Sequence, residues 1–82
     1  MIILINRVTG FSEDDFTATV EMIDPDDIKY IRRWHLKGSL QERFPDGFSL
    51  IQLKNEDKFK VSQSIEVLNQ RINGIRDAKA SS

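Results

Sequence analysis

The sequence has no cysteine, which excludes both a disulfide framework and a zinc site built on thiolates. It also has no long hydrophobic run. Its longest apolar stretch is the short run that contains Ile2 to Ile5 and ends before Asn6, which is far too short to cross a bilayer and lacks the basic flank of a signal peptide. We therefore expect a cytoplasmic protein that does not insert into membranes.

Glycine and histidine are also scarce, which removes further classes of chemistry. The four glycines are scattered at predicted turns, and none belongs to a glycine-rich phosphate loop. His35 is the only histidine and offers little towards a nucleophile–base pair or a metal site. A calcium loop counted from Asp24 would need glycine where Lys29 stands and glutamate where His35 stands. We therefore predict no enzyme activity, no catalytic residue, no metal and no cofactor.

The length and the charge distribution are more informative. Eighty-two residues make one domain, which buries only a little over ~60% of its unfolded surface, so a partner or self-association could add to its stability. The net charge is −1, but the signs are separated along the chain. Residues 11–27 carry seven acids and no base, whereas residues 29–37 carry four bases and no acid. This separation permits a charged binding face on a nearly neutral protein.

Apolar alternation predicts strands in the first half of the chain. Residues 1–8 are apolar and β-branched, and predict a strand that ends at Thr9-Gly10. Residues 16–23 predict a half-buried strand whose apolar side chains share one face. These are Phe16, Ala18, Val20 and Met22. Residues 28–36 also fit a helix, but their aromatic and β-branched content favours a strand with Ile28, Tyr30, Arg32 and Trp34 on one face.

The second half predicts a hairpin followed by a helix. Residues 47–54 are the strongest strand, with Ile51 and Leu53 on one face and Phe48 and Leu50 on the other. The NEDK turn reverses the chain, and residues 59–61 return. Residues 37–44 are ambiguous. Ser39 and Glu42 form a capping-box pattern, but the Pro-Asp-Gly at 45–47 is a hairpin signal, and we favour a strand over residues 39–44.

The C-terminal helix has both a start and a stop. Ser62 or Ser64 can cap it, and Asn73-Gly74 is a typical end. Its apolar stripe consists of Ile65, Leu68, Ile72 and Ile75. The expected fold is α+β, a small antiparallel sheet of four to five strands packed by one C-terminal amphipathic helix. We expect a single domain over residues 1–75 and a flexible polar tail over 76–82.

Two groups of residues are candidates for binding a partner. The first is the basic and aromatic run of residues 29–37, whose cations can neutralise phosphates or acids while its rings stack. It contributes Lys29, Tyr30, Arg32, Arg33, Trp34 and Lys37. The competing interpretation packs Ile31 and Trp34 inwards and pairs the arginines with the acids of residues 24–27. The second group, Phe48 and Leu50, lies on the sheet face away from the helix and would be left for a partner or a second copy.

The order of these motifs resembles the small FlbD-like flagellar proteins. The opening MIILINRVTG, the DPDDIKYI segment, Pro45-Asp46, SLIQLKN, KFKV and SQSIEVLNQRI follow the family pattern over most of residues 1–75. Residues 35–44 depart from it as an insertion, and Glu56 replaces the family's turn glycine, which predicts a longer loop than a two-residue turn. The resemblance implies a motility-associated accessory protein without catalytic residues.

A weaker resemblance is to the C-terminal half of LytTR-type DNA-binding domains, although Val61-Ser62-Gln63 lacks their arginine and their N-terminal half is missing. Taken together, the sequence favours a non-enzymatic binding or accessory protein that acts through protein–protein contact, in motility or in phage or host regulation. The alternative is a small nucleic-acid-binding transcriptional regulator that uses residues 29–37. A homodimer is compatible with either function.

Overall fold

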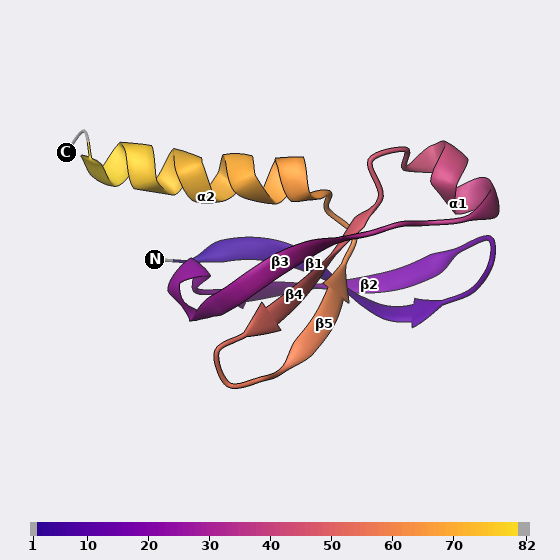
Figure 1. The fold of residues 1–82 in the computed structure, drawn as a ribbon, viewed down its shortest axis with the longest axis horizontal. Helices are drawn as coiled ribbons and strands as arrows, with labels where there is room; N and C mark the ends of the chain where they lie inside the picture. Colours follow the sequence, from indigo (N-terminus) through magenta and orange to yellow (C-terminus); the bar gives the residue numbers. More distant parts are fainter. Residues whose placement is uncertain (1, 81–82) are drawn as a thin grey trace.

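The computed structural model describes the backbone of residues 2–80 and the side chains of residues 2–74. It is an α+β fold, as predicted, with one antiparallel sheet and a long C-terminal helix lying along it (Figure 1). The elements in chain order are β1 (Ile3–Phe11), β2 (Phe16–Ile23), a short 3-10 turn η1 (Pro25–Asp27), β3 (Ile28–Trp34), α1 (Gly38–Arg43), β4 (Phe48–Leu53), β5 (Lys58–Val61) and α2 (Ile65–Ala80).

The sheet has five strands in the order β2-β1-β5-β4-β3. The β1–β2 hairpin is joined to the other three strands by a short seam between β1 and β5. One registered pair, Arg7 with Val61, holds this seam, together with the bond that Ser62 N–H donates to the Asn6 carbonyl. Within the described chain, β2 and β3 are therefore the two edges of the sheet.

The first core cluster lies between the sheet and α2. It contains Ile3, Ile5, Ile51, Phe59, Val61, Leu68 and Ile72. Ser64 begins the helix, because its Oγ accepts from Val67 N–H at 3.3 Å, which confirms the predicted cap. The predicted stripe is confirmed at Leu68 and Ile72, which are buried, and at Ile65, which is half-buried. The side chain of Ile75 lies outside the described residues.

The helix end was predicted wrongly. Asn73-Gly74 was expected to stop the helix, but α2 continues to Ala80, so most of the expected tail is helical in its backbone. A side chain at position 74 would meet no described atom within 4 Å of its Cβ beyond its chain neighbours and its own helix backbone, so the packing there does not require glycine. A glycine within a helix costs only about 1 kcal/mol relative to alanine, which the rest of the helix can offset. Residues 81–82 lie outside the described residues.

The second core cluster is aromatic and is organised around Phe48. It contains Leu36, Leu40 and Phe48, with Val8, Phe16, Trp34 and Phe44 packed against them. The strand favoured for residues 39–44 is wrong, because Gly38–Arg43 is the helix α1. Leu40 on α1 is fully buried in this cluster. The capping-box pattern and the hairpin signal are of similar strength, and the free energy gained by burying Leu40 favours the helix.

The turn between β4 and β5 spans residues 54–57, longer than a two-residue hairpin, as the substitution at Glu56 predicts. Its ends are closed by the bond from Leu53 N–H to the Asp57 carbonyl at 2.8 Å. Glu56 adopts φ +75°, a left-handed conformation that glycine takes more readily.

Candidate functional site

The basic run of residues 29–37 is divided by its own strand geometry. Because β3 alternates, Ile31 and Arg33 face α2, whereas Tyr30, Arg32 and Trp34 face the other side of the sheet. Ile28 was predicted on the side of Tyr30, but it packs with the helix-side cluster. A register shift between Ile28 and Tyr30 moves it there. The run is therefore not one continuous basic face.

Two cations of the run are held by acids from other elements. The Arg33 guanidinium donates to the Glu66 carboxylate on α2 and to the backbone carbonyl of Asp46. Lys29 Nζ lies 3.2 Å from a carboxylate oxygen of Glu56. The expected pairing with the acids of residues 24–27 is absent from the ion pairs of the described residues. Instead, the Asp24 carboxylate accepts from Asp26 N–H at 2.9 Å and caps η1.

The ion pair between Arg33 and Glu66 makes stability depend on pH. The hydrogen bond from Arg33 lowers the pKa of Glu66 below its ordinary value of 4.5 and raises the pKa of Arg33. A lowered carboxyl pKa gives stability that is complete above the ordinary pKa and is lost as the pH falls through the folded-state value.

We therefore expect Glu66→Gln to lower the midpoint of urea unfolding at pH 7, with a difference from wild type that shrinks below the ordinary carboxyl pKa. Urea titrations at pH 7, 4 and 2.5 measure this. Glu13→Gln, at an exposed acid without an ion pair among the described residues, is the matched control. An unchanging Glu66→Gln difference across these pH values would contradict the assignment.

Arg32 is joined on the sheet face opposite α2 by two lysines from outside the run. Arg32 on β3 and Lys60 on β5 both lie beside Leu50 of β4, so the three side chains form one row across the strands. Lys58 occupies the next row, beside Gln52. The two lysines were not among the predicted contacts, although the alternation of KFKV places them away from Phe59 and Val61.

The aromatic rings on this face are already covered by the chain's own cations. The Arg32 guanidinium carbon lies 4.8 Å from the centroid of the Tyr30 ring. Lys60 Nζ lies 3.9 Å from the centroid of the Trp34 ring. A base would have to displace these cation–π contacts before stacking, which weakens the case for nucleic acid at this face.

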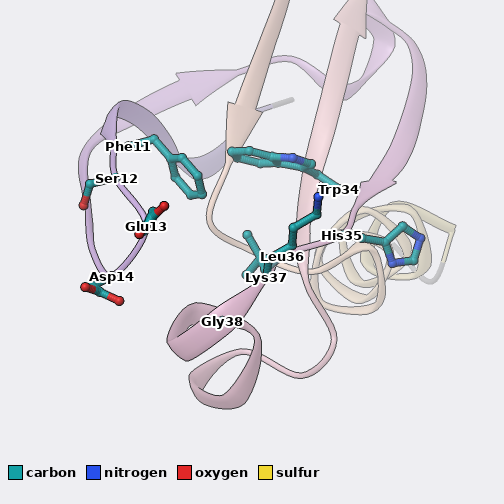
Figure 2. A pocket seen from close by; sticks show the side chains of 9 residues that line it. All are labelled: Phe11, Ser12, Glu13, Asp14, Trp34, His35, Leu36, Lys37 and Gly38. Atoms are coloured by element: carbon teal, nitrogen blue, oxygen red, sulfur yellow. The ribbon is translucent and has the colours of Figure 1, made fainter.

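A cleft with a volume of about 560 Å³ lies where the β1–β2 loop meets residues 34–38 (Figure 2). The rings of Phe11 and Trp34 meet at its inner wall with centroids 4.7 Å apart. Glu13 lines one side and Lys37 the other, so its charges are mixed. Figure 2 shows the His35 imidazole directed away from Phe11 and Glu13. The two acids that line the cleft, Glu13 and Asp14, therefore lie on the opposite side from the His35 ring.

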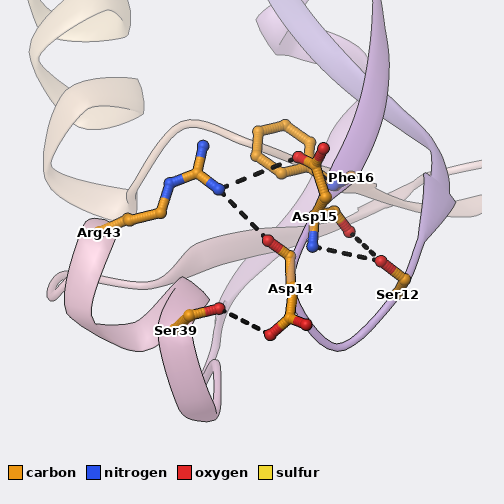
Figure 3. A network of polar contacts seen from close by, with 6 residues as sticks. All are labelled: Ser12, Asp14, Asp15, Phe16, Ser39 and Arg43. Carbon is orange, nitrogen blue, oxygen red and sulfur yellow. Dashed lines mark hydrogen bonds and ion pairs between the residues drawn. The ribbon is translucent and has the colours of Figure 1, made fainter.

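The acidic loop beside this cleft is held in place by α1 (Figure 3). Ser39 Oγ donates to the Asp14 carboxylate at 3.0 Å, so it serves the loop and not the predicted capping box. Arg43 donates to the Asp14 carbonyl at 3.3 Å and lies 3.9 Å from the Asp15 carboxylate. Ser12 Oγ donates to the Asp15 carbonyl within the loop itself. These acids have a structural role.

Phe48 and Leu50, the other predicted contacts, differ in their exposure. Phe48 is fully buried, with the ring centroids of Phe16 and Phe44 at 4.9 Å and 5.1 Å from its own. The chain itself covers Phe48, which corrects its prediction as a partner contact. Leu50 is half-buried between the cations of Arg32 and Lys60.

An exposed apolar surface lies instead on the β1–β2 hairpin. Leu4 and Met22 are directly opposite each other and are 53% and 69% exposed. Val20, two residues before Met22, is 66% exposed, and Ile2, two residues before Leu4, is 58% exposed. We call these four residues the outer strip. The alternation of β2 was predicted correctly, but only Phe16 of its apolar face is half-buried, and the face is open from Ala18 to Met22.

The outer strip adjoins the free edge of β2, and this edge differs from that of β3. Between residues 17 and 23, Glu21 is the only charged side chain, and there is no proline. Arg7 neutralises Glu21 from β1 at 3.6 Å. The β3 edge has three cations and a register shift, which are features that prevent strand addition. The β2 edge lacks such protection.

Comparison with family models, with curated proteins and with solved structures finds no match to this chain. In the described residues, no group of three or more acidic or histidine side chains is placed to hold a metal ion. Neither helix in that part of the chain has the length and apolar character that a bilayer crossing demands.

Proposed function

We propose that this protein is a non-enzymatic binding module that acts through protein–protein contact at the β1–β2 hairpin. The observation that carries this proposal is the outer strip, four large apolar side chains that are each more than half exposed beside an unprotected sheet edge. Exposed apolar groups at one site usually mark an interaction surface. Strand addition would supply backbone hydrogen bonds while the strip supplies apolar contact.

The resemblance to FlbD-like proteins supports an accessory role of this kind in a motility system or in phage or host regulation. We also propose that the protein acts in the cytoplasm. The basic face of Arg32, Lys58 and Lys60 would then steer an acidic partner and raise its association rate. Its position on the sheet, separate from the outer strip, allows the two contributions to be tested independently.

Affinity capture from a lysate of the host organism tests the proposal, with bound proteins and nucleic acids identified separately. We expect a partner protein to be retained by wild type and lost by the double variant Val20→Lys/Met22→Lys, whose positions are exposed and cost the fold little. The control is Arg32→Ala/Lys60→Ala, which should slow capture without abolishing it.

The same pair of variants separates the two functions. Retention of nucleic acid that is lost with Arg32→Ala/Lys60→Ala and kept by Val20→Lys/Met22→Lys would replace protein binding by the nucleic-acid alternative. Identical retention by all three proteins would exclude the outer strip as the binding surface.

A further inference from the structure

The edge of β2 has backbone groups to offer a partner strand. In an antiparallel pair, each strand uses only half of its N–H and C=O groups on one neighbour, and β1 is the only strand beside β2 in the described chain. The backbone bonds outside the ladder, as far as the described residues extend, include none from residues 17–23. The groups that point away from β1 are therefore free to continue the ladder.

We propose that this partner is a second copy of the same chain, whose β2 pairs antiparallel with this β2 about a two-fold axis beside Val20. The inference rests on the proposed protein-binding function and identifies its partner. Antiparallel pairing of one strand with its own copy is the isologous arrangement that closes a dimer and leaves no further free β2 edge. The two five-stranded sheets then become one continuous sheet.

The composition of β2 fits its own copy. The strand presents threonine, alanine, valine and methionine with a single acid, so two copies meet without a row of like charges. The β3 edge would bring Lys29, Arg32 and Arg33 against the same cations of a second copy, which opposes pairing there. A continuous sheet also keeps the outer strips on one side, so the two strips become neighbours.

The register follows from face matching and charge. Residues opposite each other in a continuous sheet must point to the same face, so the axis passes beside a residue and not between two. An axis at Glu21 would oppose two glutamates, and one at Ala18 would bring Glu21 against Asp15. An axis at Val20 pairs Val20 with itself and sets Glu21 against Thr19.

An axis at Met22 would let only residues 21–23 of β2 pair, which leaves most of the strand unpaired. The neighbouring register, with its axis at Thr19, is the other one that pairs most of the strand without opposing two acids. It would place Met22 opposite Phe16, whose ring is committed to Phe44 and Phe48. The Val20 axis sets Met22 against the small Ala18 and makes a β-branched pair at the centre, which is a favourable cross-strand contact.

The absence of native cysteine gives a direct test, because one introduced thiol is the only one in the chain. Under mild oxidation, Val20→Cys should form a covalent dimer at micromolar protein, since a residue on the axis faces its own copy within disulfide range. Val67→Cys, at an exposed valine on α2, is the matched control and should remain monomeric. Thr19→Cys should crosslink less than Val20→Cys.

Sedimentation equilibrium of the unmodified protein supplies the second measurement. We expect a concentration-dependent mass that approaches twice 9.5 kDa. Val20→Lys should weaken dimerisation roughly 10-fold or more, because two ammonium groups would meet at the axis, and Val67→Lys should leave it unchanged.

Specific outcomes would overturn the inference. A wild-type protein that stays monomeric at millimolar concentration, or Val67→Cys that crosslinks as readily as Val20→Cys, excludes the β2 dimer. If such a monomer still captures a different protein through Val20 and Met22, the proposed function stands and the partner is a foreign strand. If the dimer forms but no Val20-dependent capture is seen, self-pairing is the complete binding activity.

Discussion

Phe48→Ala is expected to cost about 3–5 kcal/mol of unfolding free energy, the largest loss among the substitutions considered. Phe48 is fully buried, and its ring centroid lies within 6.0 Å of those of Phe16, Phe44 and Trp34. Truncation would remove the ring's apolar burial and its edge-to-face contacts, and would leave a cavity under α1. Since native domains are stable by about 5–15 kcal/mol, the substitution would remove a large part of the stability of this one.

Chemical denaturation followed by far-UV circular dichroism measures the loss. Phe11→Ala makes the same chemical change at a ring that is half exposed and whose one aromatic neighbour is Trp34, so it should cost only about 1 kcal/mol. Phe48→Leu, which keeps much of the volume, should fall between them. Equal losses for Phe48→Ala and Phe11→Ala would contradict the assignment of Phe48 to the core.

The sheet was predictable because its signal is local. Period-two alternation, together with β-branched and aromatic composition, located the five strands to within a few residues. Ser64 and the stripe of Leu68 and Ile72 located the start and the buried face of α2. The sheet order and the seam between β1 and β5 were not predictable, because a short window of sequence contains no information about which distant strands pair.

The errors share one physical cause, which is that burial is decided by distant residues. Alternation in β2 identified an apolar face but could not reveal that nothing in the described chain covers Val20 and Met22. Residues 38–43 carried both helical and hairpin signals, and Phe48 decided the outcome by giving Leu40 a place to pack. Local pattern fixes which side chains share a face, and only the tertiary fold determines what the face meets.

The candidate binding residues show the same division. Strand alternation already implied that Arg32 and Arg33 lie on opposite faces, but the partner of Arg33, Glu66, is more than thirty residues away. Lys58 and Lys60 join Arg32 only through the register of three strands. The basic run could be recognised in the sequence, but the surface to which it contributes could be recognised only from the pairing of the strands.

Gly47→Ala is expected to destabilise the protein by about 2–4 kcal/mol, although it adds only one methyl group. Gly47 has φ +74°, where a side chain costs about 1–2 kcal/mol. A Cβ there would also lie 2.8 Å from the Trp34 carbonyl oxygen, which belongs to the backbone of β3 and cannot rotate away. Because Trp34 pairs with Phe48 in the sheet, relieving the clash would separate β3 from β4 beside the second core cluster.

Gly74→Ala is the matched control, and it should change stability in the opposite direction. Gly74 lies inside α2, and a Cβ there would meet no described atom within 4 Å apart from its chain neighbours and the backbone of its own helix. Alanine there should stabilise the protein by about 0.5–1 kcal/mol through helix propensity. Urea unfolding of the two variants side by side gives the comparison. If Gly47→Ala were as stable as wild type, the 45–47 turn would not hold its glycine in the left-handed conformation, and the close approach of that turn to β3 would have to be abandoned. The opposite signs follow because one glycine is required by its surroundings and the other is not.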